Sequence, residues 1–419
     1  MIDKKLDKYN FKEEFKFVVH QHQNLFDALK QARARPIFVG GCVRDFVLGR
    51  SFTDIDIEVH GIEQDELEAL LEAVGGFQYT GRAFGVYRTD GLEIAMPRLE
   101  RKIGTKHTDF AVDLDPNLSF QMATKRRDLT INAMGYDWFN EELLDPYEGL
   151  ADCQNGILRE VCHKTFREDD LRALRVAQFI SRLGFESTDS LIQLCAEADL
   201  SVLSRERIGA ELYKLIWIGE APLKGFKFLE QTALINQLFL GEFEKGQRQA
   251  FYHCCQRCAE NEDDFLRAKA IYVAFFWYGP QDKDWLQKEL VGLGFAKNDV
   301  VWGRRVAQWM DTLFNATQKK IAFYEALYQL SLLNVDIYQV AALVKVLDGD
   351  EWAIEEIEKV CFDDLAPKVQ AADLLTAGVL PGPRVAELLK MARVHQYMDL
   401  EIDKKQLLEI VLGDSSGTS

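Results

Sequence analysis

The sequence predicts an α+β head at the N-terminus followed by a long all-helical region, and three observations support this fold class. In the first 155 residues or so, short β-like runs alternate with helical stretches. From about residue 160, successive segments have apolar residues at spacings of three and four, joined by short polar connectors. A chain of 419 residues is also too long for one ordinary core, and its 47% apolar content can fill several.

The expected elements follow from these periods. Four β-like runs in the head read PIFVGG, TDIDIEV, GVYRT and LEIAM, at residues 36–41, 53–59, 85–89 and 92–96. A Gly-Gly turn after the first run is expected to open a helix over CVRDFVLG, residues 42–49. The helical spacing predicts further helices over residues 169–185, 207–219, 264–279, 299–314, 324–333, 337–347 and 383–394.

Composition and charge limit the class of protein. The net charge of −17 argues against indiscriminate binding of polyanions, so a nucleic-acid site must be a local basic patch. No run of about 18 uncharged apolar residues occurs and the N-terminus is charged, so we expect a soluble, cytoplasmic protein without a membrane partner. Eight cysteines spread over a chain of this length are more typical of reduced thiols than of a disulfide framework. The sequence YHCCQRC, with His253, Cys254, Cys255 and Cys258, favours buried helical thiols over zinc, since no second Cys or His pair accompanies it.

Acidic residues interrupt the second β-like run. In a strand, Asp54, Asp56 and Glu58 would share one face and the intervening apolar residues the other. Neighbouring carboxylates repel one another unless a cation lies between them, and Mg²⁺ prefers such oxygen ligands. The alternative is a half-exposed strand with a polar outer face. Gly40 and Gly41 favour the magnesium interpretation, because a glycine turn entering a helix presents backbone N–H groups that can hold a triphosphate.

At these residues the sequence resembles a known family. GGCVRD followed by LGRSFTDIDIEV is similar to motif A of the class II tRNA nucleotidyltransferases, the CCA-adding enzymes, of the polymerase-β-like superfamily. Four further blocks follow in the family's order and resemble motifs B to E: RRDLTINAMGYD, LLDPYEGLADCQNGILR, REDDLRALRVAQFISRLGF and SRERIGAELYKLI, at residues 126–137, 143–159, 167–185 and 204–216. The resemblance covers about half the chain.

The resemblance implies a polymerase-β-like nucleotidyltransferase head with a small mixed or antiparallel sheet, and an elongated all-α neck, body and tail. The expected boundaries are residues 1–155 for the catalytic head, 156–225 for the neck that recognises the base, 226–345 for the body and 346–419 for a tRNA-binding tail. The several bacterial members with a second, metal-dependent phosphohydrolase domain carry paired His-Asp motifs there. This chain contains no His-Asp dipeptide.

The function that the resemblance implies is template-independent addition of C, C and A to the 3′ end of tRNA from CTP and ATP. Two Mg²⁺ ions held by Asp54 and Asp56 would support an in-line displacement that releases pyrophosphate. Glu93 is either a third carboxylate near the metals or an exposed strand residue. The alternatives are an enzyme that adds only A, a bacterial poly(A) polymerase, and a non-catalytic RNA-binding relative. No required protein partner is evident from the sequence.

Motif D makes chemical sense as a base reader. Thr165 and Glu168 form a capping-box pattern that predicts a helix starting near Phe166, with Asp169 and Arg172 on one face of its first turns. Cytosine and adenine both present an amino donor beside a ring-nitrogen acceptor. A carboxylate beside a guanidinium complements that edge and rejects uracil and guanine. The alternative is an ordinary helical ion pair.

The remaining candidates also come from the motifs. We expect Asp128 to cap a helix DLTINAM, and the two arginines before it to contact the nucleotide. Arg44 and Asp45 lie either beside the nucleotide, as the resemblance implies, or in an ion pair. The expected nucleotide-binding residues are Gly40, Gly41, Arg44, Arg126, Arg127, Asp169, Arg172 and Arg175.

An acidic chain also needs basic residues to hold an RNA primer. The candidates for contact with the phosphates of the tRNA acceptor arm are Arg159, Lys164, Arg167, Arg205, Arg207 and Lys214. Residues 98–127 are basic at both ends and poor in regular periodicity. By resemblance they span the flexible loop that switches the enzymes from C to A addition. The alternative is an ordinary surface loop.

Overall fold

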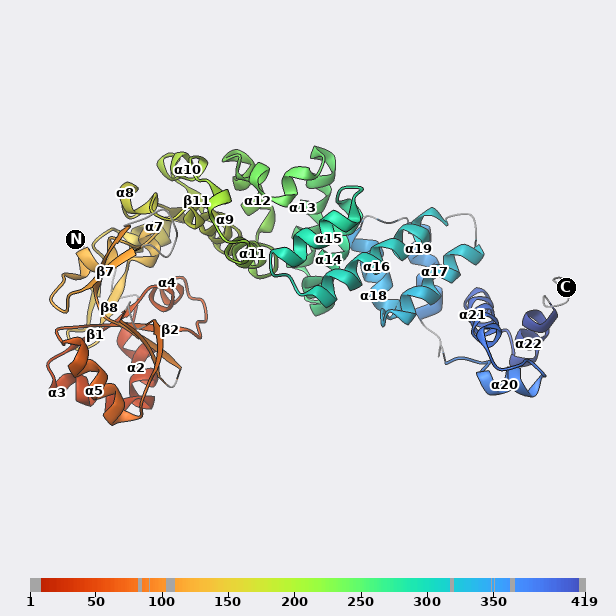
Figure 1. Ribbon diagram of the computed structural model, residues 1–419, viewed down its shortest axis with the longest axis horizontal. Coiled ribbons are helices and arrows are strands. Elements are labelled where there is room, and N and C mark those ends of the chain that lie inside the picture. The colour runs from red at the N-terminus through yellow and green to blue at the C-terminus, as the bar shows by residue number, and fades with distance from the viewer. Residues whose placement is uncertain are drawn as a thin grey trace. The chain divides into compact units, whose positions relative to one another are not determined.

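The computed structural model describes residues 9–81, 85–89, 91–102, 110–316, 320–347, 349, 351–361 and 366–413. The chain divides into two compact units (Figure 1). Unit 1 comprises residues 1–215 and 224–237, and unit 2 comprises residues 216–223 and 238–419. The finer division into head, neck, body and tail stays a prediction.

Unit 1 is built on a seven-stranded mixed sheet with the strand order β3-β4-β5-β2-β1-β8-β9. Strands β2 and β5 run parallel, and every other neighbouring pair is antiparallel. Its strands are β1 Arg35–Val39, β2 Ile55–His60, β3 Gln78–Gly81, β4 Val86–Thr89, β5 Leu92–Ala95, β8 Gly135–Asp137 and β9 Glu142–Leu144. Two further pairs are β6 Arg98–Lys102 with β7 Phe110–Leu114, and β10 Ile157–Leu158 with β11 Glu186–Ser187. The predicted α+β head is therefore confirmed.

The register of β1 and β2 assigns the two faces of the sheet as the alternation predicts. Phe38 pairs with Ile57, and its ring stacks on that of Phe15 from the N-terminal helices at a centroid distance of 4.2 Å. Val39 pairs with Asp56 on the opposite face. Since successive side chains of a strand alternate between faces, one face of the sheet is an aromatic core and the other carries the carboxylates.

Unit 1 also contains helices before, between and after these strands. They are α2 Phe11–Gln21, α3 Gln23–Gln31, α4 Gly41–Val47, α5 Gln64–Val74, α6 Phe120–Thr124, η2 Thr130–Asn132, α7 Gly149–Asn155, α8 His163–Phe166, α9 Leu171–Leu183, α10 Asp189–Ala196, η3 Leu200–Val202, α11 Arg205–Tyr213 and η5 Leu234–Gln237. The π-helical turn η4 Lys214–Ile218 and α12 Pro222–Gln231 span the boundaries between the units.

Two local predictions are wrong. The expected helix over residues 128–134 is a single 3-10 turn, η2, because the chain enters β8 at Gly135. The expected helix start near Phe166 is also wrong: Thr165 lies in the short α8, and α9 begins only at Leu171. The described residues of the segment 98–127 include strands β6 and β7 and helix α6. Residues 103–109 lie outside the described ones, so the loop interpretation of this segment stays a prediction.

All regular secondary structure among the described residues of unit 2 is helical. Its elements are η6 Phe239–Glu242, α13 Lys245–Glu260, η7 Leu266–Ala270, α14 Ile271–Tyr278, α15 Lys283–Gly292, α16 Lys297–Asn315, α17 Lys320–Leu332, α18 Ile337–Val346, α19 Glu351–Cys361, α20 Ala371–Thr376, α21 Pro383–Met398 and α22 Lys404–Gly413. Every helix predicted in this part of the chain is confirmed. Among the described residues, no helix combines the length and the apolar character needed to cross a bilayer.

The cysteine-rich segment lies on α13. Cys254, Cys255 and Cys258 are buried, whereas His253 is exposed. Burial raises the pKa of the Cys255 thiol, as expected for a thiol in an apolar surrounding. The histidine and the thiols therefore do not share a face, and the predicted buried helical thiols are confirmed.

Candidate active site

A polar cavity of about 450 Å³ in unit 1 brings together most of the predicted site residues. The carboxylate-bearing face of the sheet, the glycine turn, the arginines of motif B and the start of α9 all contribute to it. Its lining consists of Gly40, Gly41, Arg44, Asp56, Arg126, Arg127, Asp128, Asn132, Asp169, Leu171, Arg172, Arg175 and Arg207. Asp56 of the predicted metal-binding carboxylates thus faces the same cavity as Asp169 and Arg172, which are far away in sequence. Asp54 and Glu93, both described, are outside its lining.

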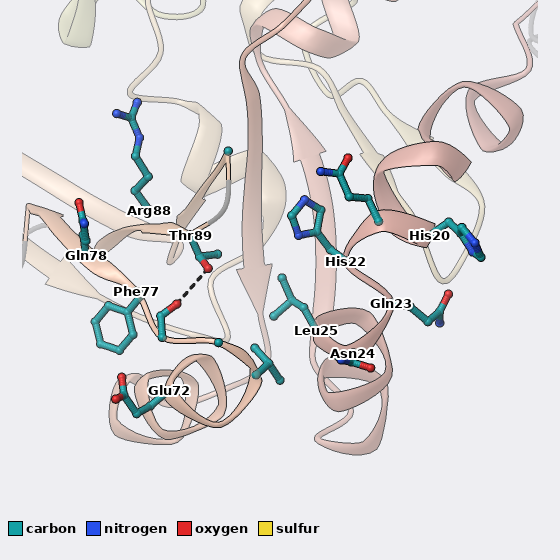
Figure 2. A pocket seen from close by; sticks show the side chains of 15 residues that line it. His20, His22, Gln23, Asn24, Leu25, Glu72, Phe77, Gln78, Arg88 and Thr89 are labelled. Carbon is teal, nitrogen blue, oxygen red and sulfur yellow. Dashed lines mark hydrogen bonds between the residues drawn. The ribbon is translucent and has the colours of Figure 1, made fainter.

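A larger cavity of about 1000 Å³ in the same unit contains none of the predicted site residues. Figure 2 shows His20, Gln23 and Asn24 from the α2–α3 junction on one side and Arg88 with Thr89 from β4 on the other. Thr89 Oγ1 donates to the carbonyl of Gly76 at 2.9 Å, a bond that ties β4 to the turn after α5. The lining side chains of His20 and Arg88 are exposed. The smaller cavity, with its converging charges, is therefore the stronger candidate for chemistry.

The turn at Gly40 lets two functional side chains approach the backbone. Its backbone φ of +72° lies in a region that residues with a side chain rarely adopt. A Cβ at this position would lie 3.0 Å from Arg127 Nη1 and 3.8 Å from Asp56 Oδ2. Glycine is thus required both by the backbone conformation and by the space that Arg127 occupies.

The carboxylates next to the turn are crowded. Asp56 pairs in register with Glu93 on the parallel strand β5, and Asp54 is exposed just before β2 begins. Burial raises the pKa of Asp56, and the charges of Glu93 and Asp54 raise it further while Arg127 opposes them. These hard oxygen donors suit a divalent cation, whose charge would relieve the repulsion. Among the described residues, no three such side chains are already gathered around one point as metal ligands.

The arginines give the cavity its positive side. Arg127 Nε and Arg207 Nη1 are buried donors, and within the described part of the chain neither has a hydrogen-bond partner. Arg126 Nη2 lies 3.9 Å from the buried Glu58 Oε2. Buried donors are rarely left unpaired, so unsatisfied guanidinium groups in a polar cavity indicate an anionic ligand.

The two base-reading candidates lie together but are not paired with each other. Asp169 accepts a hydrogen bond from Arg207 Nη2 at 2.7 Å and one from the backbone N–H of Leu171 at 3.2 Å. Arg172 Nη1 donates to the carbonyl of Thr165 at 2.7 Å, and its Nη2 donates to that of Arg126. The alternative interpretation, an ion pair between Asp169 and Arg172 within one helix, is therefore not observed in this described segment, because Asp169 precedes α9 and is bound to α11 instead.

Two buried ion pairs flank the cavity. Arg44 binds the carboxylate of its neighbour Asp45 with two hydrogen bonds of 2.9 and 2.8 Å, so the ion-pair alternative is observed although Arg44 also lines the cavity. Asp128 accepts hydrogen bonds from Leu129 N–H, Asn132 Nδ2 and Arg175 Nε at 2.8, 3.0 and 2.7 Å. We expected Asp128 only as a helix cap, and Asn132 not at all. The Asp128–Asn132 spacing of four was the available signal.

Replacing Asp128 with asparagine is expected to destabilise unit 1 at neutral pH by about 2 kcal/mol, since it removes the charged hydrogen-bond partner of Arg175, whose side chain is only about a third exposed. Arg175, Asn132 and Arg172 hold the pKa of Asp128 well below its usual range despite the opposing effect of burial. A depressed pKa contributes stability above the unfolded pKa, about 3.9, and that contribution is lost as the pH falls below it. Urea unfolding from pH 7 to pH 3 should therefore show a steeper loss in the wild type than in Asp128→Asn. Parallel pH profiles would contradict this expectation.

The predicted RNA-contacting residues are mostly elsewhere. Arg207 lies in the cavity and binds Asp169. Arg159, Arg167 and Lys214 form ion pairs with Asp152, Glu197 and Glu211. Lys164 and Arg205 are exposed. Contact of these residues with RNA stays a prediction.

Comparison with known proteins supports the motif assignment. Residues 37–159 match the family of poly A polymerase head domains. Two curated proteins from Xylella fastidiosa strains 9a5c and M12, each named multifunctional CCA protein, are 39% identical to this chain over 209 residues, 48% of either length. The chain thus aligns with about half the length of these curated relatives.

Solved structures resemble the chain over a greater length. A CCA-adding enzyme in an apo form covers 99% of this chain and 98% of its own, with a TM-score of 0.73 at 20% identity. The Thermotoga maritima CCA-adding enzyme complexed with tRNA covers 95% of both chains, with a TM-score of 0.71 and 20% identity. The Bacillus stearothermophilus enzyme in complex with CTP covers 94% of this chain and 97% of its own, with a TM-score of 0.68 at 20% identity. Over 209 residues the chain is therefore similar in sequence to the multifunctional CCA proteins, its residues 37–159 match the poly A polymerase head domain, and its fold resembles that of the CCA-adding enzymes.

Proposed function

We propose that this protein adds C, C and A to the 3′ end of tRNA from CTP and ATP without a nucleic-acid template. The observation that carries the proposal is the shared cavity, in which Asp56 and the glycine turn face the same space as Asp169 and Arg172. The base of a nucleotide bound in this cavity would lie at Asp169 and Arg172, and its reacting phosphate would lie beside Asp56 and the glycine turn. The matched regions of proteins named for CCA addition give independent support.

The phosphate end of the nucleotide would lie against the head. We propose that Arg126 and Arg127 hold the triphosphate, since guanidinium groups bind phosphate oxygens with two parallel hydrogen bonds. Gly40 and Gly41 leave room for the phosphates to approach the backbone. Asp54 and Asp56, with Glu93, would hold two Mg²⁺ ions, which when bound lower the pKa of the primer 3′-hydroxyl and stabilise charge on the departing pyrophosphate.

The base would be read at the start of α9. Asp169 presents a carboxylate acceptor and Arg172 a guanidinium donor, the complement of the edge that cytosine and adenine share. Both side chains are already bound, to Arg207 and to two backbone carbonyls. These bonds hold the groups in place before the base arrives, which reduces the entropy lost on binding.

The acceptor arm of the tRNA would be recognised by shape and phosphates, because an A-form helix exposes few base edges. We propose that Arg159, Lys164, Arg167, Arg205 and Lys214 contribute to this contact.

We also propose a division into a catalytic head over residues 1–155, a neck over 156–225, a body over 226–345 and a tRNA-binding tail over 346–419. Residues 103–109, within the loop proposed for the switch from C to A addition, lie outside the described residues.

The test is the length of the product made from a tRNA ending in its discriminator base, in CC or in CCA. We expect addition of CC with CTP alone and of CCA with both nucleotides, and of a single A to the CC-ending tRNA with ATP alone. Activity only on the CC-ending tRNA would favour A-only addition. Long A tails on unrelated RNAs would indicate a poly(A) polymerase. Absence of pyrophosphate release on all substrates would favour a non-catalytic RNA-binding relative and refute the proposal.

A further inference from the structure

The neck helix α9 is joined to the head by a closed set of polar contacts around one aromatic ring, in which both carboxylates are buried and the arginines that α9 contributes are about a third exposed. The members of this set, here called the polar ring, are Arg44 and Asp45 of α4, Asp128 and Asn132 of motif B, and Arg175, Phe179 and Arg182 of α9. We propose that the polar ring positions the base-reading groups and thereby sets nucleotide selectivity, and that Asp45, Phe179 and Arg182 do so without touching the nucleotide. This inference rests on the proposed function and assigns residues to its specificity.

The contacts run from one end of α9 to the other through the head. Arg182 Nη2 donates to Asp45 Oδ2 at 3.0 Å, and the same carboxylate binds Arg44 through both of its oxygens. Arg44 Nη1 then donates to Asn132 Oδ1 at 2.6 Å. Asn132 Nδ2 donates to Asp128 Oδ1 at 3.0 Å. Asparagine suits this place because its amide accepts from an arginine on one side and donates to a carboxylate on the other.

The circuit closes on α9 itself. Asp128 accepts from Arg175 Nε at 2.7 Å, and Arg175 lies two turns before Arg182 on the same helix. Between them lies Phe179, whose ring is covered by the guanidinium carbons of Arg44 and Arg175 at 5.1 and 5.5 Å from the centroid. Residues four and seven apart share a helix face, so α9 presents all three side chains to the head.

Because the centre of the polar ring is buried, its charged groups depend on one another for partners. The side chains of Arg44, Asp45, Asn132 and Phe179 are all less than a tenth exposed. A buried charge that loses one partner is strongly destabilised, so the contacts of the ring are expected to hold or fail together. The three arginines and two aspartates also leave one net positive charge beside the cavity, which suits a triphosphate.

The ring is linked directly to the base-reading groups. Arg172 lies one turn before Arg175 on α9, and its Nη2 donates to the carbonyl of Arg126, two residues before Asp128. A rotation or shift of α9 relative to the head would therefore move Arg172 relative to the arginines proposed to hold the triphosphate. Recognition of a base edge tolerates little displacement, and a misplacement of about 1 Å is enough to cost a large factor in rate. Asp45, Phe179 and Arg182 are not lining residues of the cavity.

The test uses the full-length protein with Arg182→Gln, which removes the charge that closes the ring, and Arg182→Lys, which keeps it. Steady-state kinetics on a CC-ending tRNA and on one ending in its discriminator base would give kcat/KM for ATP, CTP, UTP and GTP. For Arg182→Gln we expect about a tenfold fall in the preference for CTP and ATP over UTP and GTP, with the KM for tRNA unchanged. Arg182→Lys, which keeps the positive charge, should retain much of the preference for CTP and ATP. Phe179→Leu, which removes the stacked ring, should resemble Arg182→Gln.

The matched control is Arg304→Gln in unit 2, where Arg304 donates to Asp284 at 2.6 Å and is about as exposed as Arg182. It should leave selectivity unchanged. Equal losses of kcat/KM for all four nucleotides, or a change confined to the KM for tRNA, would overturn the proposal. So would wild-type selectivity in Arg182→Gln and Phe179→Leu. If circular dichroism shows that one of these two variants is unfolded, wild-type selectivity in the other variant would refute the role of the polar ring. A wild type that adds no nucleotide to any tRNA would instead refute the proposed function.

Discussion

Replacing Asp56 with alanine is expected to abolish nucleotide incorporation, with a loss on the order of a thousandfold or more, and Asp54→Ala is expected to act in the same way. A bound divalent ion supplies several kcal/mol of charge stabilisation in phosphoryl transfer, and the carboxylates are its only proposed anchors here. The measurement is the rate of extension of a CC-ending tRNA with ATP at saturating Mg²⁺.

The fold should survive the Asp56 substitution. Burial and the charges of Glu93 and Asp54 raise the pKa of Asp56, so folding disfavours its ionised form, and we expect alanine at this position to leave the free energy of unfolding nearly unchanged. Thermal unfolding followed by circular dichroism would check this point. Asp65→Ala, at an exposed position on α5, is the control and should retain full activity. Near-wild-type incorporation by either Asp54→Ala or Asp56→Ala would refute their assignment as metal ligands.

Alanine at Asp169 or Arg172 is expected to remove discrimination against UTP and GTP. A two-point hydrogen-bonded contact with a base edge contributes about 1 to 3 kcal/mol of discrimination, which corresponds to roughly 5- to 150-fold in kcat/KM. The measurement is the ratio of kcat/KM for CTP to that for UTP, and for ATP to that for GTP.

The Asp169 and Arg172 variants differ in their expected side effects. Arg172→Ala leaves the carbonyls of Thr165 and Arg126 without their donor, so it should also lower stability, whereas Asp169→Ala frees only Arg207 and Leu171 N–H. Alanine at the exposed pair Asp284 and Arg304 of unit 2 is the control. Unchanged selectivity in both neck variants would remove the base-reading proposal.

Much of the fold could be predicted because periodicity is a local property. The strand at residues 55–60 was visible from the alternation of Ile and Asp, and its register on β1 confirms which residues share a face. The long helices of unit 2 were visible from their apolar spacing. Short elements were less predictable: residues 130–132 form one 3-10 turn because β8 must begin at Gly135, where Phe120 and Ile37 leave no room for a Cβ. That constraint comes from residues far away in sequence.

The sequence by itself determined the types of residue that could carry the chemistry, since the spacing of Asp54 and Asp56, the glycine turn and the order of the motifs are all local. Only the tertiary structure decided their partners. Asp169 binds Arg207, 38 positions away, instead of Arg172, and Asp128 binds Arg175 across 47 positions instead of capping a helix. The physical reason is burial: a charged group removed from water must find a partner wherever the packed chain brings one, and sequence proximity does not specify which partner that is.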